Sequence, residues 1–147
     1  MEITRRSDYA IRIMLELARQ ADSAPVSVRR LAERQELPYA FARSIQRDLV
    51  AAGLVTTQRG ATGGVSLARP AASISLLDII RAEQGHVSIS VCAHDPAWCS
   101  RMGGCAVHKV WCEADRLVSR YLAEQDLASL AGAGAGVGEE GRVGESA

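Results

Sequence analysis

The sequence of 147 residues has few aromatic side chains, no long apolar run and no net charge. Aromatic residues make up 4% of the chain, too few for a surface that stacks on the bases of single-stranded nucleic acid. No uncharged apolar stretch approaches the ~20 residues of a membrane helix. Arg12 and Glu16 interrupt the first apolar stretch, which argues against a signal peptide. We therefore expect a cytoplasmic protein with no membrane partner.

Sequence motifs of enzymes are also missing. The chain has no C-x-x-C pair, and no G-x-G-x-x-G fingerprint follows a stretch with the pattern of a strand. No pair of side chains stands out as a catalytic acid and base. The sequence therefore predicts neither an enzyme nor a small-molecule substrate, and an oxidoreductase that uses its thiols directly is the alternative from another class.

The charges are distributed unevenly along the chain, although 17 basic and 17 acidic side chains cancel. Residues 1–82 carry 12 basic and 8 acidic side chains, whereas residues 83–147 carry 5 basic and 9 acidic ones. A basic half beside an acidic half indicates that the first half meets a polyanion.

A helix-turn-helix followed by a glycine-tipped hairpin is predicted in the basic half. Apolar residues at helical spacing and short runs rich in Val and Thr predict helices over 8–19, 28–35, 38–52 and 76–83 and strands over 54–58 and 65–69. The predicted caps are Ser7 or Asp8, Ser27 and Ser75, and Gly53 ends the third helix. This order is typical of a winged helix-turn-helix, in which one helix enters the major groove of double-stranded DNA.

The third helix and the hairpin carry the side chains that we expect to contact DNA. Arginine and glutamine pair with base edges, serine serves a phosphate, and an arginine in a small loop enters the narrow minor groove. The predicted DNA-binding residues are Arg43, Ser44, Gln46, Arg47, Arg59, Gly60, Gly63 and Gly64. The alternative is a plain α+β domain whose polar faces are merely solvated.

All four cysteines lie in one short segment of the acidic half, with the spacing Cys92-x6-Cys99-x5-Cys105-x6-Cys112. The spacing lacks the C-x2-C knuckles of structural zinc sites and suits the broader thiolate cage of an iron–sulfur cluster. We therefore expect Cys92, Cys99 and Cys105 to be metal ligands. Cys112 is expected to pack in the core from the helix that carries it. His86 and His94 are expected to lie on the surface. Zinc or bare redox-sensitive thiols in the same loop are the alternative.

A single long helix is predicted from about residue 105 to 130, after a strand over 87–91. Its apolar stripe exceeds what one small domain buries, so we expect the helices of two subunits to pack together in a homodimer. A two-fold dimer would present two recognition helices to a near-palindromic operator, with half-sites ~34 Å apart or a multiple of it. The alternative is a helix that folds back over its own domain.

Three stretches of the chain resemble the bacterial Rrf-two family of winged-helix transcription regulators. They are MEITRRSDYAIRIMLELA, LVAAGLVTTQRGATGGVSLARPAASISLLDIIRAEQG and the cysteine loop, and the resemblance covers residues 1 to about 125. It implies a homodimeric regulator, in most members a repressor, and an iron–sulfur cluster on Cys92, Cys99 and Cys105. One residue more than the usual five separates Cys92 from Cys99.

The resemblance leaves two candidates for the fourth ligand of the cluster. In the nitric-oxide-sensing branch an aspartate on the partner's first helix completes a four-iron cluster, and Asp8 stands at that position. In the branch that regulates cluster assembly a histidine three residues after the last cysteine completes a two-iron cluster, and His108 stands there. We favour Asp8 and a 4Fe-4S cluster over His108 and a 2Fe-2S cluster.

The predicted fold is mainly α with a small β wing. It comprises a winged helix-turn-helix DNA-binding domain over 1–84, a cluster-binding loop and dimerisation helix over 85–130, and a disordered Gly/Ala-rich tail over 131–147. The predicted function is a transcriptional regulator whose operator affinity changes when nitric oxide, oxidants or iron shortage damage the cluster.

Overall fold

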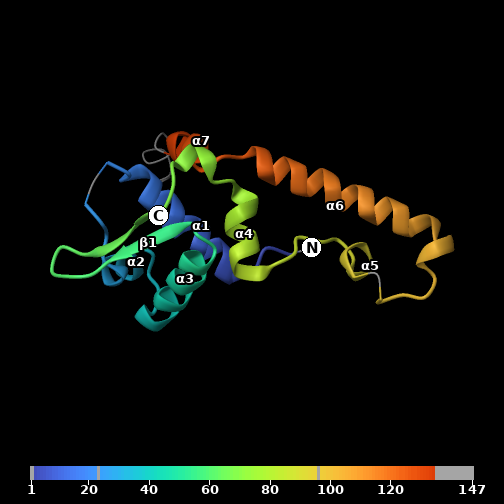
Figure 1. The fold of residues 1–147 in the computed structure, drawn as a ribbon, viewed down its shortest axis with the longest axis horizontal. Coiled ribbons are helices and arrows are strands. Elements are labelled where there is room, and N and C mark those ends of the chain that lie inside the picture. The colour runs from blue at the N-terminus through green and yellow to red at the C-terminus, as the bar shows by residue number, and fades with distance from the viewer. Residues whose placement is uncertain (1, 23, 96, 135–147) are drawn as a thin grey trace, which may run out of the picture.

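The computed structural model describes residues 2–22, 24–95 and 97–134. In chain order its elements are α1 Arg5–Arg19, α2 Val28–Arg34, α3 Tyr39–Ala51, β1 Val55–Gln58, β2 Gly64–Leu67, η1 Ala71–Ser73, α4 Leu76–Gln84, α5 Val91–His94, η2 Met102–Gly104, α6 Ala106–Glu124 and α7 Leu127–Ala133. Helix α6 leads away from a body that holds α1 to α4 and α7, and α5 lies at its far end (Figure 1). None of the helices in the described ranges has the length and apolarity needed to span a membrane.

The body is held together by the apolar faces of its helices. Met14 of α1, Ile45 and Leu49 of α3, Ile79 of α4 and Leu127 of α7 are all fully buried in one cluster. Burying a large aliphatic side chain stabilises a fold by about 1.5–3 kcal/mol. Because two of these side chains come from α3, the core holds that helix in place.

The β wing is a two-stranded antiparallel hairpin, as predicted. Its register runs from Val55 opposite Leu67 to Gln58 opposite Gly64. Val65 also exchanges two backbone hydrogen bonds with Val26, of 2.9 and 2.8 Å, which tie the hairpin to the segment before α2. The mainly helical fold with a small wing is thereby confirmed.

The predicted start of the first helix is wrong by three residues. Helix α1 begins at Arg5, and Thr4 is its cap, because the Thr4 hydroxyl accepts a hydrogen bond from the Ser7 N–H at 3.1 Å. Ser7 therefore lies inside the first turn, where it is buried. The predicted caps Ser27 and Ser75 are confirmed, and Ser75 forms a capping box with Asp78.

The predicted strand over 87–91 is absent from the structure, and the chain forms a bend there followed by α5. The carboxylate of Asp115 on α6 accepts hydrogen bonds from the Ile89 N–H, at 2.7 Å, and from the Ser88 hydroxyl. A backbone N–H bound to a side chain in this way is not available to a sheet ladder. Of the three alternating apolar side chains only Val87 is buried, beside Val118 and Leu122 of α6, whereas Ile89 and Val91 are exposed.

The predicted long helix is two helices. Helix α6 ends at Glu124, and Asp126 caps α7 by accepting a hydrogen bond from the Ser129 N–H at 2.8 Å. The break turns Leu127 into the core of the body. Helix α7 includes residues 131–133, which the sequence assigned to the disordered tail, and Ala131 is buried. Gly134 is the residue that ends α7, and residues 135–147 of the predicted tail lie outside the described residues.

Candidate DNA-binding surface and cysteine loop

A groove of about 570 Å³ separates α3 from the β wing. Seven of the eight predicted DNA-binding residues line it: Arg43, Gln46, Arg47, Arg59, Gly60, Gly63 and Gly64. Ser44, the eighth, lies elsewhere on α3, where its hydroxyl accepts a hydrogen bond from Arg6 at 3.0 Å. Residues from two separate elements thus meet at one surface, which we call the α3–wing groove.

The groove also contains side chains that the sequence analysis missed. Arg29 at the start of α2 lies with its guanidinium 5.0 Å from the centre of the Tyr39 ring, and both residues line the groove. The sequence signal that could have identified Arg29 is its position beside Arg30, directly after the first residue of a predicted helix. Of the described residues that line the groove, four are arginines and none is acidic. Such a surface attracts a polyanion.

Two glycines of the wing stand where another backbone segment comes too close for a side chain, Gly63 within the hairpin and Gly64 against the segment before α2. A Cβ atom on Gly64 would lie 2.5 Å from the backbone carbonyl of Val26, and one on Gly63 would lie 2.1 Å from the Gln58 carbonyl oxygen. Real Cβ atoms do not approach backbone atoms this closely, so the positions require glycine.

Gly64→Ala is therefore expected to push the wing away from the segment before α2. We expect a loss of about 1–3 kcal/mol in the free energy of unfolding, measured by urea denaturation, since overpacking carries costs of this size. The matched control is Gly132→Ala on α7, where the added Cβ meets nothing within 4 Å. Equal stability of the two variants would contradict the close approach of the wing.

The three predicted cluster cysteines lie between the start of α5 and the start of α6. Cys92 is on α5, with its sulfur 3.3 Å from the Ser90 hydroxyl oxygen, and Cys105 is the cap residue of α6. Cys99 lies between them, and all three are half-buried free thiols. The start of α6 at Cys105 agrees with the predicted start of the long helix.

The candidates for a fourth ligand lie on different helices. Asp8 on α1 forms an ion pair with Arg12 at 2.9 Å. His108 lies in the first turn of α6, with Nε2 3.5 Å from the sulfur of Cys112. Within the described ranges, no three His, Cys, Asp or Glu side chains come close enough together to hold a metal. The donor types suit an iron–sulfur cluster, but the described residues of a single chain do not bring enough of them together to form the site.

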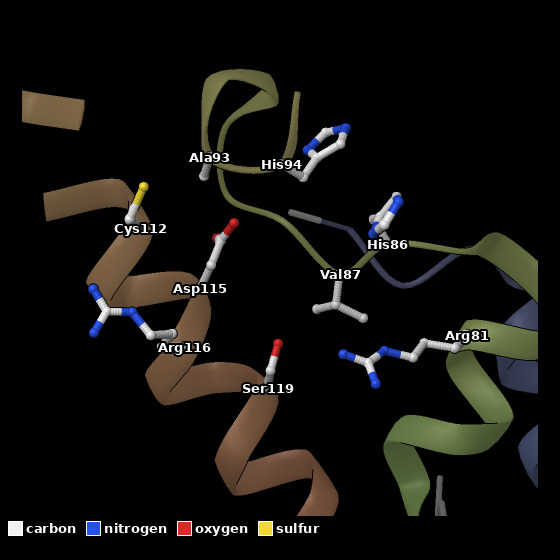
Figure 2. Close-up of a pocket in the computed structure, with 9 residues that line it drawn as sticks. All are labelled: Arg81, His86, Val87, Ala93, His94, Cys112, Asp115, Arg116 and Ser119. Carbon is white, nitrogen blue, oxygen red and sulfur yellow. The ribbon is translucent and has the colours of Figure 1, made fainter. Parts of the chain in front are cut away.

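A second hollow of about 380 Å³ lies between α4, the bend after it and α6 (Figure 2). His86 and His94 are exposed beside it, as predicted, and their rings stack with centroids 5.0 Å apart. Cys112 lines this hollow and is half-buried, so the prediction that it packs in a core is wrong for the single chain. The reason is that α6 buries none of its residues within one chain.

The apolar stripe of α6 is only partly covered. Val118 and Leu122 pack against Leu77, Ile80 and Val87 of the body. The rest of the stripe is exposed: Val107 by 49%, Val110 by 57%, Trp111 by 37%, Leu117 by 48% and Tyr121 by 64%. Contiguous apolar patches of this kind typically mark a protein–protein interface.

Comparison with known proteins assigns the family. Residues 3–133 match the model of the Rrf2 family, described as iron-dependent transcriptional regulators. The chain is 32% identical over 130 residues to the protein rrf2 of Nitratidesulfovibrio vulgaris, which covers 88% of this chain and 87% of that protein.

Two solved structures of regulators are also similar to this chain. CymR, the global cysteine regulator of B. subtilis, has a TM-score of 0.75 and 27% identity, over 90% of this chain and 98% of CymR. IscR of T. potens has a TM-score of 0.73 and 26% identity, over 99% of this chain and 94% of IscR. The winged helix-turn-helix, the arginine-lined groove and these likenesses agree: the chain belongs to the Rrf2 family of transcriptional regulators, which are not enzymes.

Proposed function

We propose that the protein is a cytoplasmic homodimeric repressor that binds a near-palindromic DNA operator and responds to the state of an iron–sulfur cluster. The observation that carries DNA binding is the α3–wing groove, with four arginines and no carboxylate among its described lining residues. Arg43 and Gln46 lie side by side on α3, with the Arg43 guanidinium 3.3 Å from the Gln46 side-chain oxygen. Such side chains read base edges in the major groove, and Arg59 on the wing suits the minor groove.

Arg59→Ala is expected to weaken DNA binding and to flatten its dependence on salt. Each phosphate contact contributes ~0.9 to the slope of log K against log salt concentration, so one lost contact lowers the slope by about that amount. The slope is measured by fluorescence anisotropy on a duplex that the wild-type protein selects from a random-sequence pool. Arg120→Ala, which removes the same charge from an exposed position on α6, is expected to leave the slope unchanged. An unaltered slope in Arg59→Ala would remove Arg59 from the contacts.

The exposed stripe of α6 supports the homodimer. A second copy of the same helix supplies a matching apolar face, and a two-fold arrangement presents two α3–wing grooves to two half-sites. We further propose that residues 1–84 form the DNA-binding domain and residues 85–130 the cluster-binding loop and dimerisation helix, with Leu127 packed back into the body.

The proposed cluster ligands are Cys92, Cys99 and Cys105, with Asp8 of the other subunit as the favoured fourth ligand and His108 as the alternative. Asp8 belongs to α1, a helix of the body, whereas Cys92 belongs to α5 and Cys105 caps α6. Helix α5 and the start of α6 lie away from the body (Figure 1). A ligand from the partner would therefore link the cluster to the placement of the two bodies. Loss of the cluster would break that link and change the fit to the operator.

Native mass spectrometry of the anaerobically isolated protein tests this proposal. We expect the mass of a dimer with four iron and four sulfide ions per subunit. A dimer with zinc, or with no metal, would instead support the second candidate, which is the same DNA-binding regulator with zinc or bare redox-sensitive thiols in the cysteine loop. The observation that favours bare redox-sensitive thiols is the likeness of the chain to CymR of Staphylococcus aureus, whose structure is known in an oxidized form.

A further inference from the structure

The side chain of Arg6 lies where three helices of the body meet. From the first turn of α1, its Nε lies 2.6 Å from a carboxylate oxygen of Glu83 at the end of α4. Its Nη2 donates a hydrogen bond to Ser44 at 3.0 Å and forms an ion pair with Asp48, and both of these residues are on α3. The guanidinium also lies 5.6 Å from the centre of the Phe41 ring, again on α3.

The side chain of Glu83 is fully buried, which is unusual for a carboxylate. Within the described part of the chain, neither of its carboxylate oxygens accepts a hydrogen bond of acceptable geometry. Burial raises the pKa of Glu83 to about 7, against the attraction of Arg6 and with a smaller contribution from the negative charge of Asp48. From α6, Val118 and Leu122 pack on α4, and the charged Asp115 and Arg116 line a hollow with Arg81 of α4 that does not include Glu83. Arg6 is therefore the counter-charge of Glu83.

The raised pKa means that the ionised carboxylate opposes folding. The protonated form stabilises the fold fully below about 4.5, the ordinary value for glutamic acid, and this contribution is lost as the pH rises through about 7. A buried charge with one partner costs stability that a neutral side chain of the same shape would not cost. Stability alone thus gives no reason for a carboxylate at residue 83.

The contacts of Arg6 offer such a reason. Ser44 and Asp48 flank Arg47 on α3, and Ser44 is next to Arg43, so the residues that Arg6 holds lie in the same turns as the arginines of the α3–wing groove. The N-terminal turn of α1 is independently fixed to α4, because Gln84 accepts hydrogen bonds from the Thr4 N–H at 3.0 Å and the Ser7 hydroxyl at 2.7 Å. Arg6 therefore extends from a fixed base to α3.

We propose that Arg6 and Glu83 are positioning residues of the recognition helix: the ionised carboxylate of Glu83 orients Arg6, and Arg6 holds α3 at the angle that DNA binding requires. This role rests on the proposed function, since it concerns the same DNA-binding surface. Neither residue touches DNA. It follows that removing the charge of Glu83 weakens DNA binding while it stabilises the fold.

Glu83→Gln tests the role, because it keeps the shape of the side chain and removes the charge. Binding is measured from pH 6 to pH 8 on the duplex selected from the random-sequence pool. We expect the affinity of the wild type to fall roughly 3- to 30-fold between pH 8 and pH 6, relative to the variant, which stays weak throughout. The three histidines remain in both proteins, so their titration cancels in this comparison.

The free energy of unfolding separates positioning from a general structural role. We expect Glu83→Gln to be more stable than the wild type at pH 8, with the difference shrinking towards pH 5 as Glu83 becomes protonated. A merely structural residue would lower stability and affinity together. The control is Glu113→Gln, an exposed carboxylate on α6, which should change neither profile.

A second variant, Arg6→Lys, retains the positive charge beside Glu83. A single ammonium group lacks the planar fork of arginine, so it does not hold Glu83, Ser44 and Asp48 together. We expect it to weaken binding at pH 8 to the level of Glu83→Gln. Wild-type affinity and pH dependence in Glu83→Gln would overturn the positioning role alone, whereas failure of the wild type to bind DNA at any pH would overturn the proposed function with it.

Discussion

Leu117→Asp on α6 is expected to convert the protein to monomers and to weaken operator binding by roughly 10²- to 10⁴-fold. Leu117 is 48% exposed in the single chain and lies in the stripe that we assign to the partner subunit. An aspartate there would place an unpaired charge in an apolar interface, which is strongly unfavourable. A dimer that binds two half-sites at once has an affinity about 10²- to 10⁴-fold higher than a monomer that binds one half-site, so loss of the dimer removes that gain. Size-exclusion chromatography with light scattering and the binding assay measure the two effects.

The matched control is Ala123→Asp, which introduces the same charge on the same helix. Ala123 is exposed and stands seven and three residues after Arg116 and Arg120, so it shares their polar face and lies outside the stripe. We expect this variant to remain a dimer with wild-type affinity. A dimeric Leu117→Asp protein with unchanged affinity would show that α6 is not the interface.

Cys105→Ser is expected to abolish the cluster completely. Cys105 caps α6 without a side-chain hydrogen bond, and serine is among the best helix caps, so the helix should keep its start. The serine hydroxyl is a poor substitute for a thiolate as an iron ligand. We expect the anaerobically purified variant to be colourless and free of iron, by absorption spectroscopy and metal analysis, but still dimeric. Its operator affinity should match that of cluster-free wild type and should not respond to nitric oxide. We expect this affinity to differ by about 5- to 150-fold from that of wild type with its cluster.

Cys112→Ser is the control, since Cys112 lies on α6 beside His108 and outside the three proposed ligands. It should retain full iron content. Asp8→Ala and His108→Ala then decide the fourth ligand, because only the variant that lacks the true ligand should lose or destabilise the cluster. Iron bound at wild-type level by Cys105→Ser would rule out the proposed ligand set.

The candidate DNA-binding surface was largely predictable because its signals are local. Ser27 and Gly53 mark the limits of two neighbouring helices through short-range hydrogen bonds and a positive φ of 70° at the glycine. Gly63 is needed because of a backbone contact with Gln58, five residues away, whereas the contact of Gly64 with Val26 is distant in the sequence. Most residues of the groove then followed from helical spacing. Ser44 was predicted with them but lies outside the groove, because its hydroxyl accepts a hydrogen bond from Arg6, which the periodicity of α3 does not show.

The errors came from segments whose form depends on distant partners. The alternating residues 87–91 satisfy the pattern of a strand, but no strand of the described residues lies beside them, and Asp115 accepts hydrogen bonds from the Ile89 N–H and the Ser88 hydroxyl. The stripe of α6 continues into α7 in the sequence, but burial of Leu127 in the body breaks the helix at residue 125. Local propensity is a weak influence when tertiary contacts oppose it.

The sequence by itself determined the winged helix-turn-helix, its basic surface and the three thiols of the loop, because periodicity, caps and ligand type are properties of neighbouring residues. Only the tertiary structure decided that Arg6 joins Glu83 to Ser44 and Asp48, that the apolar stripe of α6 is left partly uncovered, and that no metal site closes within the described part of one chain. These arrangements depend on contacts between residues that are far apart in the sequence, and no local pattern encodes which distant side chains will meet.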